Sequence, residues 1–231
     1  MRDLVRATKR RVVPLLGACV LLAGGIGASA MASAGSADAA TCAGPVVAGT
    51  SCTITGTLTL TAGNLTLVSP TALGWGTVVN GVDQTLVDPT AADQVFLVND
   101  ATGIAPGWHV TAAATTYATT GGTVHSLGNT GTFASNGSLT SMTSTTAPTA
   151  ACTSGSTCTL PTDTTTYPVA ITTGTAVTPV NLYDASAATG LGSVTIGAPG
   201  ANAVGWWLNV PSNTLIGVYT STITLEIISG P

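Results

Sequence analysis

The sequence predicts an all-β protein: an antiparallel β-sandwich with an N-terminal signal peptide and a long Ser/Thr-rich surface excursion. Two observations carry the fold prediction. Thr, a β-branched residue that suits strands, fills 43 of the 191 positions after residue 40. Short stretches alternate apolar and polar residues with a period of two, Gly, Pro, Asn and Asp separate them, and no window carries a helical apolar stripe.

Residues 1–40 have the order of a secretory signal peptide. A basic stretch over 1–11 precedes an apolar run over 12–26, and small residues follow, so we expect cleavage after Ala30, Ala34 or, preferably, Ala39. The apolar run is shorter than the roughly 20 residues of a membrane span, which makes a retained anchor the weaker alternative. We therefore expect an exported single domain over 41–231, not embedded in a membrane.

The charge distribution excludes several functions. All five Lys and Arg residues lie in the first eleven positions, and the predicted mature chain carries a formal charge of −7. Its acids are Asp83, Asp88, Asp93, Asp100, Asp163, Asp184 and Glu226. Nucleic-acid binding and polybasic membrane anchoring both depend on Lys and Arg, so neither is expected. The four acids between 83 and 100 could supply oxygen ligands to calcium, but they lack EF-hand spacing, and we expect no metal.

Four cysteines remain after the predicted cleavage. Their spacing favours two local disulfides, Cys42–Cys52 and Cys152–Cys158, although four cysteines allow three connectivities. A zinc site is the alternative, which the absence of C-x2-C spacing and an oxidising compartment disfavour.

Several stretches are expected to form strands. Ile54, Leu58 and Leu60 alternate with Thr, and residues 94–98 are apolar on both faces, which is typical of a central strand. Trp108, Val110 and Ala112 share one face of the next strand, and residues 219–227 alternate throughout. Between 139 and 166, 16 of the 28 residues are Ser or Thr, so this segment should add little core and form a surface loop that could carry O-linked sugars.

The tryptophans are the candidate ligand-binding residues. Exposed indoles stack on sugar rings, and Trp75, Trp206 and Trp207 are expected to form such a platform. Trp206 and Trp207 are neighbours on one strand and point to opposite faces, so at least one should be exposed or covered by the 139–166 segment. Trp108 belongs to an apolar face and is expected in the core.

No catalytic constellation is evident. His109 and His125 are the only histidines, both in Thr-rich stretches, and no nucleophile elbow accompanies them. We therefore expect a protein that is not an enzyme and uses no cofactor.

Two segments together resemble the WxL domain of Gram-positive surface proteins. Residues 95–103, VFLVNDATG, followed by 107–110, GWHV, are similar to its proximal motif, and 217–227, GVYTSTITLEI, close to Pro231, are similar to its distal motif. The motif residues are Trp108, Val110, Tyr219, Leu225 and Ile227, where Val110 stands for the family's Leu and Leu225 for its Trp.

The resemblance implies an exported β-sandwich that attaches non-covalently to peptidoglycan, with cell-wall glycan and other surface proteins as partners. The alternative function is a structural or assembly subunit of a surface layer, pilus or coat that acts by β-strand addition.

Overall fold

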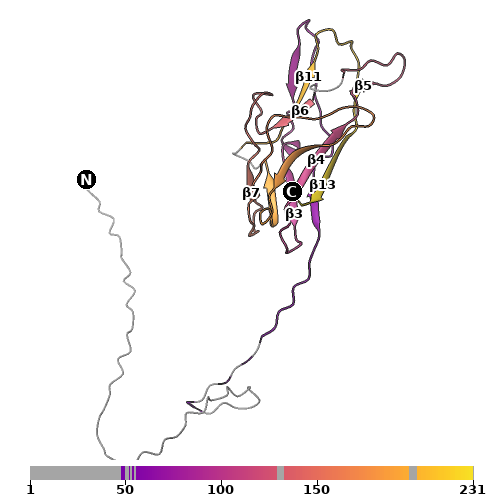
Figure 1. Ribbon diagram of the computed structural model, residues 1–231. Helices are drawn as coiled ribbons and strands as arrows, with labels where there is room; N and C mark the ends of the chain where they lie inside the picture. Colours follow the sequence, from indigo (N-terminus) through magenta and orange to yellow (C-terminus); the bar gives the residue numbers. More distant parts are fainter. Residues whose placement is uncertain are drawn as a thin grey trace, which may run out of the picture. The chain divides into compact units, whose positions relative to one another are not determined.

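The computed structural model describes residues 48, 49, 52, 54, 56–128, 133–197 and 202–230 and divides the chain into two units, 1–58 and 59–231. Every strand among the described residues lies in the second unit (Figure 1). The strands are β1 (Leu65–Val68), β2 (Gln84–Val87), β3 (Phe96–Asp100), β4 (Trp108–Ala114), β5 (Ala118–Thr119), β6 (Phe133–Asn136), β7 (Ala150–Cys152), β8 (Val169–Ala170), β9 (Val180–Ala185), β10 (Gly192–Ile196), β11 (Gly205–Val210), β12 (Tyr219–Thr220) and β13 (Ile223–Ser229). A 3-10 turn, η1 (Ala91–Asp93), is the sole helical element in this part of the chain.

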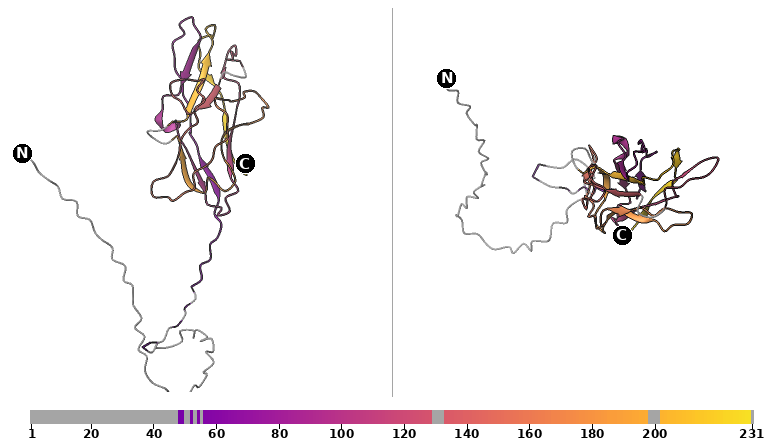
Figure 2. Two further views of the ribbon diagram at one scale, coloured as in Figure 1. Left: turned by 60° about the vertical axis from the view of Figure 1, so that its left-hand side comes forward. Right: turned by 90° about the horizontal axis from the view of Figure 1, so that it is seen from above.

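The strands pair antiparallel in four sheets. Their orders are β1-β3-β10-β7, β2-β11-β6-β8, β13-β4-β9 and β12-β5. Figure 2 shows that strands far apart in the sequence lie side by side; for example, β2 and β11 pair along Gln84–Val87 and Trp207–Val210. The predicted all-β antiparallel fold is confirmed. The predicted signal peptide at 1–40 and Cys42 lie outside the described residues.

One hydrophobic cluster joins the three larger sheets. The largest side chains in it that are fully buried include Phe96 from β3, Trp108 from β4, Phe133 from β6, Ile196 from β10 and Trp206 from β11. Side chains from all three sheets therefore meet in a single core.

The two segments that resemble the WxL motifs form neighbouring strands. β4 and β13 pair along their whole length, with Val110 opposite Ile227 and Ala112 opposite Leu225. Trp108 and Val110 are completely buried, whereas Leu225 and Ile227 are half-buried against the core. The Trp108 indole donates to the Gly190 carbonyl at 3.0 Å; Gly190 has a positive φ of 75°, and a Cβ there would collide with the indole.

Two strand predictions need correction. Ile54, Leu58 and Leu60 lie in no strand and are exposed by 84%, 80% and 84%, because no neighbouring strand pairs with their backbone. The expected continuous strand over 219–227 is divided into β12 and β13. Between the two strands, Ser221 Oγ donates to the Thr115 carbonyl at 2.6 Å, and Thr222 N donates to Thr115 Oγ1 at 2.8 Å. At these residues the chain passes from the sheet of β12 to the sheet of β13.

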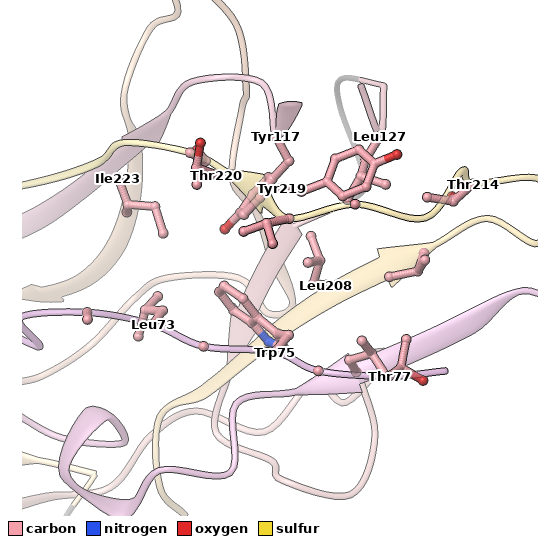
Figure 3. A pocket seen from close by; sticks show the side chains of 18 of the residues that line it. Leu73, Trp75, Thr77, Tyr117, Leu127, Leu208, Thr214, Tyr219, Thr220 and Ile223 are labelled. Atoms are coloured by element: carbon pink, nitrogen blue, oxygen red, sulfur yellow. The ribbon is translucent and has the colours of Figure 1, made fainter. Parts of the chain in front are cut away.

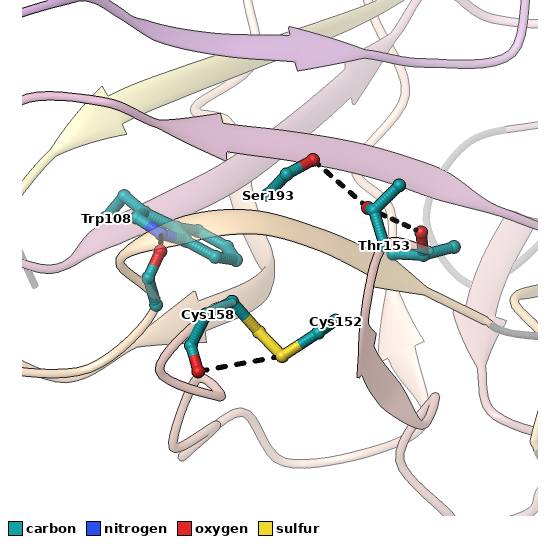
Figure 4. The surroundings of a disulfide bond; sticks show 7 residues. Trp108, Cys152, Thr153, Cys158 and Ser193 are labelled. Atoms are coloured by element: carbon teal, nitrogen blue, oxygen red, sulfur yellow. Dashed lines mark hydrogen bonds between the residues drawn. A yellow bond between two sulfur atoms is a disulfide. The ribbon is translucent and has the colours of Figure 1, made fainter. Parts of the chain in front are cut away.

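The Ser/Thr-rich segment is attached to the body along much of its length. It contributes β7 to the edge of a sheet, and Cys152 and Cys158 form a disulfide with a Cα–Cα distance of 5.5 Å, as predicted (Figure 4). Beside this bridge, the Ser193 hydroxyl donates a hydrogen bond to Thr153 Oγ1 at 3.1 Å. The bridged turn is thus held against β10, and Cys158 packs on the core.

Candidate functional site

An apolar groove of about 860 Å³ is hollowed into the described part of the chain. One wall is the loop over 70–79, and the other runs over 214–221; we call the space between them the apolar groove. Figure 3 shows Leu73, Trp75 and Thr77 on one side, Tyr219 and Ile223 on the other, and Leu208 between them. No Asp, Glu, Lys, Arg or His is among the described residues that line it.

Two hydrogen bonds fix the first wall to the neighbouring sheet. Gly74 N donates to Asp88 Oδ2 at 2.6 Å, and the Trp75 indole donates to the Trp206 carbonyl at 3.1 Å. Asp88 is completely buried at the end of β2, and its Oδ1 accepts from Thr90 N at 2.7 Å. One buried carboxylate therefore determines where the 70–79 loop lies.

The second wall is held by its own turn. Ser212 N donates to Asp83 Oδ1 at 2.7 Å, and this hydrogen bond lowers the pKa of Asp83. The Tyr219 hydroxyl donates to the Leu215 carbonyl at 2.9 Å, so that the ring lies along the wall. Beyond these contacts Leu215, Ile216 and Val218 remain exposed.

Aromatic rings form the inner end of the groove. Trp75 makes edge contacts with Tyr117, at a centroid distance of 6.0 Å, and with Phe133, at 5.6 Å. Tyr117 lines the groove, and its buried hydroxyl has no hydrogen-bond partner among the described residues. Its pKa is raised by burial, so it stays a neutral donor that an occupant of the groove could satisfy.

The structure separates the predicted platform residues. Trp75 lines the groove, together with the motif residues Tyr219 and Leu225, but Trp206 and Trp207 do not form an exposed platform. Trp206 is 0% exposed and Trp207 is 5% exposed, because β11 is an interior strand that is covered on both faces.

Each of these two indoles is satisfied by a backbone carbonyl. Trp206 packs between Phe96 and Phe133 and donates to the Asp93 carbonyl at 2.7 Å. Trp207 donates on the other face to the Ser138 carbonyl at 3.0 Å, just before the Ser/Thr-rich segment. Both residues therefore serve packing and offer no open face to a sugar.

Sequence reasoning missed most of the groove. Tyr117 and the exposed apolar residues Val78, Leu215, Ile216 and Val218 line it without having been singled out. The sequence did hold a signal, since the run Leu215–Val218 places apolar residues in a loop next to an expected strand. What the sequence lacked was any indication that this loop lies opposite 70–79.

Three of the four acids between 83 and 100, namely Asp83, Asp88 and Asp100, accept hydrogen bonds from backbone amides. Asp100 Oδ1, for example, accepts from Thr102 N at 3.0 Å and from Thr102 Oγ1 at 2.6 Å. Within the described ranges, no three side chains of His, Cys, Asp or Glu come together in a way that could hold a metal ion. No helix in these ranges is long and apolar enough to cross a membrane.

A second polar cluster ties the Ser/Thr-rich segment to β9. Asp184 accepts from Thr164 N at 2.6 Å and from Thr164 Oγ1 at 2.8 Å, and the Tyr167 hydroxyl donates to Asp163 Oδ2 at 2.7 Å. Burial and the hydrogen bond to Asp184 raise the pKa of Asp163. Burial acts against the Asp184 carboxylate too, but hydrogen bonds from Asp163, Thr164 and Thr165 prevail and lower its pKa.

This carboxyl pair predicts a stability that depends on pH. An unfolded aspartate loses its proton at about pH 4, whereas folded Asp163 keeps its proton to a higher pH because its pKa is raised. The contribution of Asp163 to the free energy of unfolding therefore falls as the pH rises through this raised pKa. The contribution of Asp184 is instead lost as the pH falls below about 4. Denaturant unfolding at about pH 4, 5.5 and 7 should show the decline, and Asp163→Asn, which keeps a donor toward Asp184, should flatten it. An unchanged slope in this variant would show that other groups cause the dependence.

The groove can therefore bind a ligand by stacking, apolar contact and hydrogen bonds to neutral groups. Comparison of the chain with protein-family models, with curated proteins and with solved structures finds no match in any of the three.

Proposed function

We propose that this chain is an exported, non-catalytic β-sandwich protein of the bacterial cell surface that attaches non-covalently to cell-wall glycan. The observation that carries the proposal is the apolar groove with Trp75 in its wall. A half-buried indole offers one face for stacking, and a groove without charged groups suits the neutral ring faces of a sugar polymer. No Lys or Arg follows residue 11, so the predicted mature chain offers no such side chain to attract an anionic wall polymer.

Hydrogen bonding is available on the first wall and at the inner end of the groove. The structure describes residues 70–79 throughout, and their backbone groups form hydrogen bonds only with side chains. Gly74 N donates to the Asp88 carboxylate, and Gln84 Nε2 donates to the Val78 carbonyl. The remaining amides and carbonyls of this loop can bond to sugar hydroxyls, and the Tyr117 hydroxyl needs a partner.

The resemblance to WxL modules belongs to the same proposal. It is supported by the pairing of β4 and β13, which places the two motif segments side by side although more than a hundred residues separate them. In this reading Trp108 and Val110 are structural, and Tyr219 and Leu225 contribute to the groove.

Binding to purified peptidoglycan in a sedimentation assay tests the function. Val78→Asp places a charge on the rim of the groove and should weaken binding by about tenfold or more, because the carboxylate must lose water when the ligand docks. Val124→Asp is the matched control: Val124 is also an exposed valine, it lies outside the groove, and binding should be unchanged.

The dependence of binding on salt concentration tests the proposed mechanism. Binding by stacking and neutral hydrogen bonds should not weaken between about 0.05 and about 0.5 M NaCl. A steep loss of bound protein over this range, or equal binding by Val78→Asp and the unmodified protein, would overturn the proposed mechanism.

A further inference from the structure

A short uncharged segment upstream of β1 exposes apolar side chains on one face. Ile54, Leu58 and Leu60 are each exposed by at least 80%, and all three occupy even positions. In an extended chain they point to one side, and Thr57 and Thr59 point to the other. Such a pattern is typical of a half-buried strand, yet this segment pairs with nothing among the described residues.

The apolar groove also exposes apolar side chains and unpaired backbone. Its rim exposes Val78, Leu215, Ile216 and Val218, and Ile216 is 88% exposed. In the stretches 75–77 and 216–218, all described, no backbone amide or carbonyl is hydrogen-bonded to another backbone group. The groove thus presents apolar side chains beside unpaired backbone, which are the two features that an added strand satisfies.

We propose that residues 56–60 of one copy of this protein bind as an added strand in the apolar groove of a second copy. The alternation places Leu58 and Leu60 in the groove and the side chains of Thr57 and Thr59 toward water. Both surfaces are neutral, since the sequence has no charged residue between Asp38 and Asp83 and the groove lining has none. No charge has to be buried when the two meet.

The chain's own course favours a second copy over its own groove. Gly63 N donates to the Ala101 carbonyl at 2.8 Å, and Ala101 N donates to the Asn64 carbonyl at 3.2 Å, so residues 63 and 64 already continue the pairing of β1 with β3. Only Thr61 and Ala62 remain to reverse the chain. A tight reversal there would lay the segment beside β1, which is in a different sheet from β2, β11 and β12 around the groove.

The resulting contact does not close on itself. The donor segment and the acceptor groove are different surfaces of the protein. An assembly of any length therefore has a free donor segment at one end and a free acceptor groove at the other. Copies should therefore add head to tail as protein concentration rises. This inference does not depend on wall binding, although the two occupants would compete for one groove.

Sedimentation velocity of the mature full-length protein over a range of concentrations tests the proposal. The unmodified protein should form a ladder of head-to-tail oligomers. Leu58→Asp/Leu60→Asp should weaken self-association by about 100-fold or more, since two apolar contacts become charged. Thr57→Asp/Thr59→Asp adds the same charges to the outward face of the same segment and should still assemble.

Mixing variants identifies the partners in the contact. Ile216→Asp impairs the acceptor but keeps the donor, and Leu58→Asp/Leu60→Asp impairs the donor but keeps the acceptor. Each should be monomeric alone, and the mixture should give a discrete dimer that grows no further. A mixture that stays monomeric, an unmodified protein that stays monomeric, or Leu58→Asp/Leu60→Asp that assembles normally would overturn the proposal.

Wall binding by the same variants separates this inference from the proposed function. Leu58→Asp/Leu60→Asp should still sediment with peptidoglycan, whereas Ile216→Asp should lose both wall binding and assembly. If assembly follows the expected pattern and no variant binds the wall, only the proposed function fails. If the wall is bound and no oligomer forms, only strand addition fails.

Discussion

Replacement of Trp206 by alanine should lower the free energy of unfolding by about 3–5 kcal/mol. The indole is completely buried between Phe96 and Phe133, at centroid distances of 5.8 and 6.0 Å, and donates to the Asp93 carbonyl. Alanine removes this packing, leaves a cavity where the sheets meet, and deprives the carbonyl of its donor. Denaturant unfolding followed by circular dichroism measures the loss.

Two further variants serve as controls for the loss of stability in Trp206→Ala. Trp206→Phe keeps most of the ring volume and loses the hydrogen bond, so its cost should be about 1–2 kcal/mol. Val124→Ala, at an exposed site, should change the free energy of unfolding by less than about 0.5 kcal/mol. A Trp206→Ala protein that unfolds like the unmodified chain but no longer binds peptidoglycan would restore Trp206 as a ligand platform.

Replacement of Asp88 by alanine should affect both stability and binding. The buried carboxylate accepts from Gly74 N at 2.6 Å and from Thr90 N at 2.7 Å, and hydrogen bonds to a charged acceptor are among the stronger ones. Alanine leaves both amides without this acceptor, and we expect a loss of about 2–3 kcal/mol. Because Gly74 adjoins Trp75, the freed loop should also reduce peptidoglycan binding at temperatures where the protein remains folded.

Asp83 supplies the control for Asp88. It also accepts from a backbone amide, that of Ser212, but its carboxylate is fully exposed and water can replace it. Asp83→Ala should therefore unfold at nearly the same denaturant concentration as the unmodified protein. Equal losses for the two variants would show that the buried carboxylate has no special role in positioning the first wall.

Local patterns predicted much of the fold. The alternation at Trp108, Val110 and Ala112 specified the buried face of β4, and the doubly apolar run near Phe96 specified β3, which lies between β1 and β10. The first prediction holds because period-two alternation reflects the burial of one face of a strand, and the second because a short continuous apolar run is typical of a strand inside a sheet. The same pattern at Ile54, Leu58 and Leu60 gave a wrong strand, since alternation shows that a segment can pair and does not supply a partner.

The candidate site was predictable only in part. Trp75 was identified as a ligand-binding residue and lines the groove, but Trp206 and Trp207 were assigned to the same platform. Adjacent residues on a strand do point to opposite faces, as expected. Of the two alternatives given for them, an exposed face or one covered by another segment, exposure is wrong, because an interior strand of a sheet can be covered on both sides.

By itself the sequence determined the class of this protein: an all-β body rich in Thr, without a positive charge beyond residue 11, and with a local Cys152–Cys158 bridge. These properties depend on composition and on residues a few positions apart. The tertiary structure alone decided that the loop at 70–79 faces the loop at 214–221 and that Asp88 holds the first of them. The groove depends on contacts between residues more than a hundred positions apart, and no local pattern encodes which of many similar Thr-rich strands will pair.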